Sequence, residues 1–221
     1  MTVREDKKEQ VRNMDFKDTI ESRRSIRKYK PEIPPEEWLE DLVDCARQAP
    51  SPSNRQPVSI LKIEDEGRRK KLHEAMLQGR DELLDPCEKQ GNKKMQNRIN
   101  VYYRYADFMF SAPWLFLLGT MSTEPGFTEH LQRAGLVEDN PKNLTPDDIT
   151  VGLYLGNMLN RATELGLGTC VLTAPMKFIT NIKGILGLQD MEPKCFLTAG
   201  FPDEEPKMPA RKQIDDILGR C

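Results

Sequence analysis

The stretch Trp114-Leu115-Phe116-Leu117-Leu118 is a continuous apolar run bounded by Pro113 and Gly119. A strand with one face in water alternates apolar and polar residues, whereas a strand covered on both faces reads as an unbroken apolar run. The sequence therefore predicts a buried strand over about 112–120, with other elements packed on both of its faces.

Downstream of this strand, the sequence predicts a long helix from Thr145 to about Leu165. Thr145 offers a capping hydroxyl, Pro146 takes the first helical position, and Asp147 and Asp148 fall in the first turn. Apolar side chains recur on one face and small or apolar residues on the other: Val151, Leu155, Met158, Leu159, Ala162 and Leu165, opposite Gly152, Leu153 and Gly156. We therefore expect this helix to be buried nearly all round.

Helices and strands alternate along the rest of the chain. Periodicity and proline positions predict helices over 15–22, 36–49 and 177–186, solvated helices within 64–104, and strands over 58–63, 169–172 and 195–199. This order favours an α+β or α/β layered fold in one domain over 14–221, preceded by a charged tail over 1–13. The polar connection 122–145 has the length of a lid or binding loop.

Composition excludes several classes of function. Lys and Arg number 33 against 35 Asp and Glu, so we expect no nucleic-acid partner. Five scattered cysteines without a CxxC pair, and two histidines without an evident acidic partner (His73 and His130), disfavour disulfides and metal sites. A polar N-terminus and the lack of a long apolar run predict no membrane segment and a cytoplasmic location.

Three separated polar stretches could address a phosphorylated, polar cofactor. They are 23–27 (Arg-Arg-Ser-Ile-Arg), 50–57 (Pro-Ser-Pro-Ser-Asn-Arg-Gln-Pro) and 209–212 (Pro-Ala-Arg-Lys). The first and last offer guanidinium, ammonium and hydroxyl groups suited to a phosphate, and the second offers hydroxyls and carboxamides between prolines. Each one alone also fits an ordinary solvated turn.

In this order the motifs resemble those of the FMN-dependent nitroreductase superfamily. Gly166-Leu167-Gly168-Thr169 and Gly200-Phe201-Pro202 add to the resemblance, which spans roughly Phe16 to Ile217. The resemblance implies a nitroreductase-like fold with a central, mixed but mainly antiparallel sheet flanked by helices. It also implies an intertwined homodimer with FMN between the subunits, and the buried helix favours such a dimer independently.

Carried over by position, the resemblance assigns roles to residues of this chain. Arg23, Arg24 and Ser25, with Arg211 and Lys212, would hold the phosphate and ribityl end, and Arg27 would face the pyrimidine edge of the flavin. A cation there stabilises negative charge on the reduced ring. The partner's loop would supply its contacts through Pro50, Ser51, Ser53, Asn54 and Gln56. Leu172, Thr173 and Ala174 would lie beside N5, where Thr173 offers a hydroxyl that could tune the flavin.

Some residues depart from the family pattern or leave alternatives open. Val58 replaces a frequent aromatic residue and Pro209 a frequent basic one, for which Lys207 or Lys212 could substitute. Cys170 beside the N5 segment is read as core filler, with a thiol that acts on substrate as the alternative. Tyr102, Tyr103 and Tyr105, with Arg98 and Arg104, could line a substrate lid or pack on the core.

The function implied by the resemblance is hydride transfer from NAD(P)H through flavin N5 to an electron-poor acceptor, by a ping-pong mechanism. Nitroaromatic, quinone or enone compounds are the acceptor classes. The alternatives are a dedicated reductase or dehalogenase of one metabolite, and a flavin-binding carrier or sensor without turnover.

Overall fold

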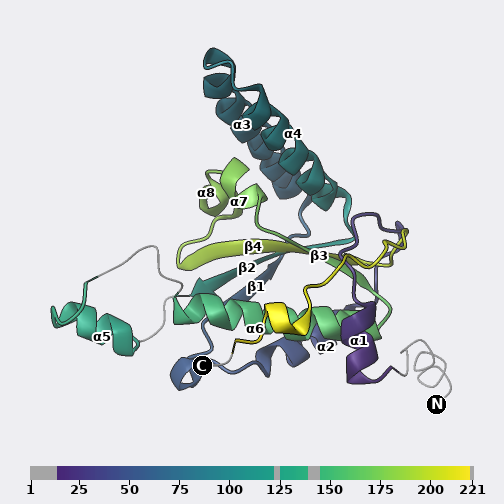
Figure 1. Cartoon of the computed structure of the whole chain (residues 1–221), viewed down its shortest axis with the longest axis vertical. Coiled ribbons are helices and arrows are strands. Elements are labelled where there is room, and N and C mark those ends of the chain that lie inside the picture. The colour runs from purple at the N-terminus through teal and green to yellow at the C-terminus, as the bar shows by residue number, and fades with distance from the viewer. Residues whose placement is uncertain (1–13, 122–124, 139–144, 220–221) are drawn as a thin grey trace.

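The computed structural model describes residues 14–121, 125–138 and 145–219. The expected tail over 1–13 lies outside these residues, as do parts of the expected lid. Of the connection 122–145, the described part contains helix α5 (Phe127–Arg133), which lies to one side of the body of the protein (Figure 1).

A four-stranded antiparallel sheet forms the centre of the fold, in the order β1-β2-β4-β3. The strands are β1 (Val58–Lys62), β2 (Trp114–Met121), β3 (Gly168–Leu172) and β4 (Met191–Gly200). Each strand was expected from the sequence. The only parallel pairing recorded among the described residues is an isolated bridge between Ser25 and Thr169.

The apolar run in β2 contributes to two separate cores. Leu115 and Leu117 pack into the core on one face of the sheet, whereas Trp114, Phe116 and Leu118 pack into the core on the other. All five side chains are buried. This alternation explains why the run is unbroken, because both positions of the two-residue period lie in a core.

Helices cover both faces of the sheet. On one face lie α2 (Glu36–Arg47) and α6 (Pro146–Glu164), with α1 (Phe16–Ser22) against α6. On the other lie α3 (Glu66–Lys89), α4 (Lys93–Asp107), α7 (Pro175–Phe178) and α8 (Ile182–Leu186). The layered α+β architecture expected from the sequence is thereby confirmed.

Two helix predictions were wrong in part. The segment 177–186 is not one helix but α7 and α8, because Ile179 takes an extended backbone conformation between them and the Asn181 side chain caps the second. Helix α6 is also not buried all round in the single chain. Ile149 is 53% and Leu153 42% exposed, and nothing lies within 4 Å of a Cβ placed on Gly152 or Gly156. An apolar stripe of α6 therefore faces outward.

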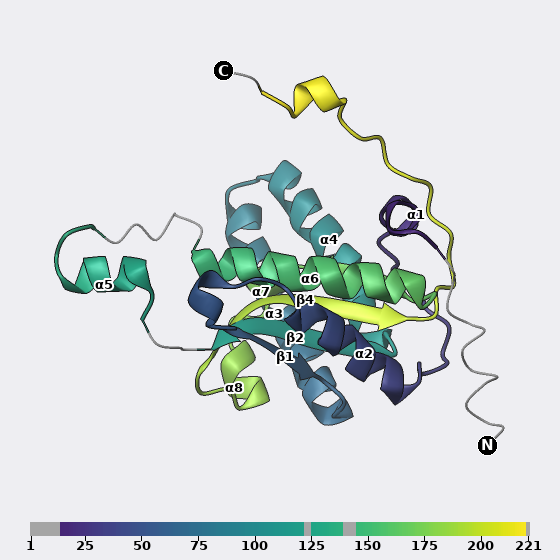
Figure 2. The same cartoon turned by 90° about the horizontal axis from the view of Figure 1, so that it is seen from below.

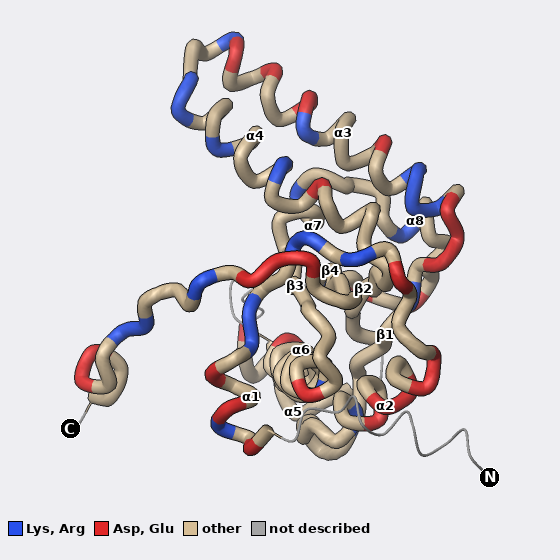
Figure 3. The backbone as a smooth tube through the Cα atoms, turned by 90° about the vertical axis from the view of Figure 1, so that its right-hand side faces the viewer, with Lys and Arg blue, Asp and Glu red and all other residues tan. Residues whose placement is uncertain are grey.

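Two features project from the layered body. Helices α3 and α4 form a long hairpin whose outer part carries many charged residues (Figure 3), and only its base packs on the core. The C-terminal segment 207–219 is exposed throughout and extends away from the body (Figure 2). We call this segment the C-terminal arm. No described helix is both long and apolar enough to cross a lipid bilayer.

Candidate functional site

The segment that carries Arg23 to Arg27 is fixed to the sheet by backbone contacts. Ile26 donates its N–H to the carbonyl of Thr169 at 2.9 Å, next to the bridge between Ser25 and Thr169. A Cβ on Gly168 would lie 2.5 Å from Ile26, so only glycine permits this close approach. The basic segment is thus held against the start of β3 and the end of α6.

Two arginines of this segment line a cavity of about 620 Å³, a size typical of small-molecule sites. Its other walls come from the end of α6 and from the turn after β4; they include Thr163, Gly166, Leu167, Gly168 and residues 202–206. Arg24 donates to the carbonyls of Glu21 and Arg23. The Arg23 guanidinium makes no recorded hydrogen bond or ion pair with the described residues, although its backbone N–H donates to Thr19. Neither guanidinium forms an ion pair with a described carboxylate, although Asp203, Glu204 and Glu205 also line the cavity. Both arginines could therefore bind an anion that enters it.

Arg27 and Cys170 lie close enough for the charge of Arg27 to act on the Cys170 thiol. Arg27 lies 6.0 Å from the ring of Tyr105 on α4. Burial raises the pKa of the Cys170 thiol, although the positive charges of Arg27 and Arg23 act in the opposite direction. Cys170 is 3% exposed. A buried, protonated thiol is a poor nucleophile, which favours the reading of Cys170 as core filler.

Loop 50–57 has an unusual backbone and lies at the other end of α6. Ser53, Asn54 and Gln56 have φ values of 51°, 54° and 49°, and each such left-handed residue costs about 1 kcal/mol. Within the loop, Gln56 donates its N–H to the Ser51 hydroxyl at 2.9 Å.

The loop reaches α6 through its arginine, because Arg55 pairs with Asp147 in the first helical turn at 2.6 Å. From Asp147 to Thr163 the helix rises about 24 Å. Loop 50–57 and Arg23 therefore lie at opposite ends of α6, and the single chain does not bring these expected site residues together.

The remaining expected residues are also separated in the single chain. Leu172 is the last residue of β3, exposed Thr173 follows it, and Ala174 precedes α7. Arg211 and Lys212 lie on the exposed C-terminal arm, which Figure 2 shows passing α1 and extending away from the body. Within one chain, only the cluster 23–27 and the strand β3 beside it lie together.

The structure adds residues that the sequence analysis missed. The Glu204 carboxylate accepts the backbone N–H groups of Arg27 and Lys28 at 2.5 and 3.1 Å, which fixes the basic segment from the opposite side. Its only signal in the sequence is its place shortly after Gly200-Phe201-Pro202. The expectation that His73 lacks an acidic partner was wrong, because its Nε2 lies 2.8 Å from Asp107.

The tyrosines of α4 were expected either to line a substrate lid or to pack on the core, and the structure divides them between an exposed and a buried position. Tyr103 is buried in the core, whereas Tyr102 and Tyr105 are more than half exposed. One helix therefore packs one tyrosine inward and presents two to the outside.

Comparison with known proteins places this arrangement in a family. The family model described as "Nitroreductase family" matches residues 20–201, which is most of the chain. Iodotyrosine deiodinase from Danio rerio is 26% identical over 204 residues, which cover 89% of this chain and 63% of that protein. The chain thus spans less than two thirds of that relative.

Solved structures show the same fold. The BluB-like flavoprotein from Clostridium difficile 630 has a TM-score of 0.77 at 24% identity, covering 95% of this chain and 100% of that one. The NADPH:FMN oxidoreductase from Vibrio harveyi, complexed with NAD+, has a TM-score of 0.65 at 20% identity, covering 93% and 76%. With the family model matched over most of its length, this chain belongs to the nitroreductase family.

Proposed function

We propose that the protein is a homodimeric, FMN-dependent oxidoreductase that passes a hydride from NAD(P)H to an electron-poor small molecule of the nitroaromatic, quinone or enone type. The observation that carries the proposal is a pair of arginines, Arg23 and Arg24, that line a cavity beside the start of β3 and form no ion pair with a described carboxylate. The family membership and the flavoprotein folds among its structural neighbours support an oxidoreductase. The four free cysteines among the described residues suit a cytoplasmic location.

A two-fold axis near the middle of α6 would assemble the separated parts. Ile149, Gly152, Leu153 and Gly156 form an outward-facing stripe that runs from the first turns of the helix to its centre. If two copies of α6 packed antiparallel along this stripe, the N-terminal end of each would lie beside the C-terminal end of the other. Loop 50–57 of one subunit would then approach the basic segment of its partner.

The C-terminal arm supports the same assembly. Ile214 and Ile217 are 76% and 72% exposed in the single chain, on a segment that extends away from the body (Figure 2). Apolar side chains on an extended segment lower their free energy by packing on another surface. On a second subunit, the arm would carry Arg211 and Lys212 toward a phosphate.

The residues that are present fit the phosphate end of FMN. Arg23 and Arg24 would bind the phosphate by charge-assisted hydrogen bonds, and Arg27 would place positive charge against the polar edge of the ring. Thr173 and Ala174 would orient the ring from the edge of β3. Bound FMN would supply the hydride chemistry, while the protein positions and tunes it.

Spectroscopy and rapid mixing test this proposal. The purified protein should show the visible absorption of oxidised flavin, which should bleach when the anaerobic protein is mixed with NADH or NADPH. Menadione or a nitroarene should then restore the colour. Colourless protein that takes up no added FMN would refute the proposal, and yellow protein that neither nucleotide bleaches would favour a carrier or sensor.

Reductive dehalogenation is the second candidate, favoured by the similarity to iodotyrosine deiodinase. A chemically reduced, anaerobic sample mixed with diiodotyrosine distinguishes the two. If diiodotyrosine reoxidises the flavin faster than a nitroarene does, and iodide is released, the dehalogenase is favoured. If the nitroarene reoxidises the flavin faster, the general reductase is favoured.

A further inference from the structure

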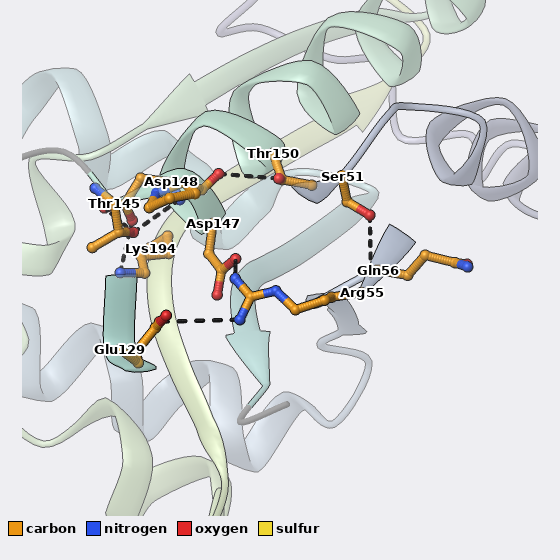
Figure 4. A network of polar contacts seen from close by, with 10 residues as sticks. Ser51, Arg55, Gln56, Glu129, Thr145, Asp147, Asp148, Thr150 and Lys194 are labelled. Carbon is orange, nitrogen blue, oxygen red and sulfur yellow. Dashed lines mark hydrogen bonds and ion pairs between the residues drawn. The ribbon is translucent and has the colours of Figure 1, made fainter. Parts of the chain in front are cut away.

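Arg55 is the one charged residue in the sequence of loop 50–57, and its side chain connects three separate segments. Its side chain is 10% exposed and reaches from the loop to Asp147 on α6 at 2.6 Å and to Glu129 on α5 at 4.0 Å. Figure 4 shows the guanidinium directed between these two carboxylates. A Cβ on Gly126 would lie 3.1 Å from its Nη1, so the backbone packs closely against it.

The residues on both sides of Arg55 are the strained ones. Asn54 and Gln56 have left-handed backbone conformations, while Arg55 itself is right-handed at φ −69°. Residues other than glycine are more stable at negative φ than in the left-handed region. A contact outside the strained residues must therefore hold the loop in its conformation. The hydrogen bonds inside the loop join residues that would move together, whereas the Arg55–Asp147 pair ties the loop to a long helix.

The helix end that receives Arg55 is itself fixed. Thr145 and Asp148 form a reciprocal capping box, and Lys194 of β4 pairs with Asp148 at 2.8 Å. Figure 4 shows these contacts beside Asp147. Asp147, which holds Arg55, therefore lies in a helical turn that the neighbouring Asp148 ties to β4 of the central sheet.

We propose that Arg55 is a positioning residue: by pairing with Asp147 it holds loop 50–57 in its left-handed conformation, and so sets the affinity of the dimer for FMN. The inference rests on the proposed function, in which Ser51, Asn54 and Gln56 face the flavin of the partner subunit. If the loop also visits conformations that cannot bind FMN, the apparent Kd equals the intrinsic Kd divided by the fraction of molecules in the binding conformation.

Hydrogen exchange on the flavin-free protein tests the contact without reference to FMN. The amides of Asn54 and Gln56 donate to Ser51 at 3.0 and 2.9 Å, so their exchange is slowed in the intact loop. Arg55→Met and Asp147→Asn should each accelerate exchange at both amides. Arg47→Met, which removes an exposed pair with Asp44 just before the loop, is the matched control and should leave them unchanged. Unchanged exchange in both test variants would overturn the proposal.

Titration with FMN tests the consequence for the site. Arg55→Met should raise the Kd for FMN by about 10- to 100-fold and alter the visible circular dichroism of bound flavin. Asp147→Asn should act in the same direction, and Glu129→Gln should have a smaller effect because its pair is longer. Arg55→Lys, which keeps the charge, should restore part of the affinity, and the double variant Arg55→Met/Asp147→Asn should lose no more than Arg55→Met alone.

The outcomes separate this inference from the proposed function. A wild-type protein that binds no FMN would refute the proposed function, and with it the role of Arg55 at a flavin site. A wild-type protein that binds FMN, together with an Arg55→Met variant of equal Kd and spectrum, would overturn the positioning role alone.

Discussion

Individual charged residues at the candidate site differ in how far they are already paired within the chain. Arg24 is held by two backbone carbonyls, Arg55 by carboxylates, and Arg23 by no described residue. An unpaired surface guanidinium contributes little to folding, whereas one hydrogen bond to a phosphate is worth about 1.5–3 kcal/mol. Ligand binding should therefore depend on Arg23 far more than stability does.

Arg23→Ala should weaken FMN binding by about tenfold or more, since about 1.4 kcal/mol corresponds to a factor of ten. Its denaturation midpoint should stay close to that of the wild type. Fluorescence titration with FMN and urea unfolding provide the two measurements. Lys17→Ala, at an exposed cation of neighbouring helix α1, is the control; an Arg23→Ala protein with wild-type FMN affinity would contradict the assignment.

At the start of α6, one side chain takes part both in the cap of the helix and in a contact with the central sheet. The Asp148 side chain accepts from the N–H and hydroxyl of Thr145 and pairs with Lys194 of β4. Burial by itself would raise the pKa of Asp148, but these hydrogen bonds outweigh it and hold the pKa below its usual value of 3.8. The ionised carboxylate therefore stabilises the fold above that value, and the contribution is lost as the pH falls through the lowered pKa.

Asp148→Asn should consequently lower the free energy of unfolding at pH 7, and the difference from wild type should shrink in strong acid. Urea unfolding measured at a series of pH values gives this curve. Asp85→Asn is the control, because the recorded partner of Asp85 among the described residues is Lys89, in an exposed pair on α3. A difference that is the same at every pH would show that Asp148 acts by packing and not by charge.

The whole molecule leaves apolar surface that a single chain does not cover. The outward stripe of α6 and the isoleucines of the C-terminal arm lie on segments far apart in the sequence, and both suit contact with a second copy. Small residues in the α6 stripe would allow two helix backbones to approach closely. The homodimer is therefore the form of the protein in which we expect a complete flavin site.

A dimeric mass should persist on dilution to nanomolar concentration, as measured by mass photometry. Ile217→Asp should shift the population toward monomer and release FMN, because it places a charge on a side chain that we expect to be buried between subunits. Ile33→Asp is the matched control, since Ile33 is 73% exposed and lies on neither α6 nor the C-terminal arm. A wild-type monomer with flavin bound would count against the dimer.

Local patterns in the sequence were sufficient for most of the fold. The apolar run 114–118 predicted a strand covered on both faces, and Thr145 and Pro146 predicted where α6 begins. The order of the short motifs identified the family. These features depend on residues near one another in the chain, where steric and hydrogen-bonding preferences act directly.

Long-range contacts were decided only by the tertiary structure. No local pattern shows that Arg55 pairs with Asp147, 92 positions away, or that Glu204 holds the N–H groups of Arg27 and Lys28. The sequence also could not show that loop 50–57 and Arg23 lie at opposite ends of α6. Such pairings follow from how whole elements pack, because the chain between two partners only limits the distance over which they can meet.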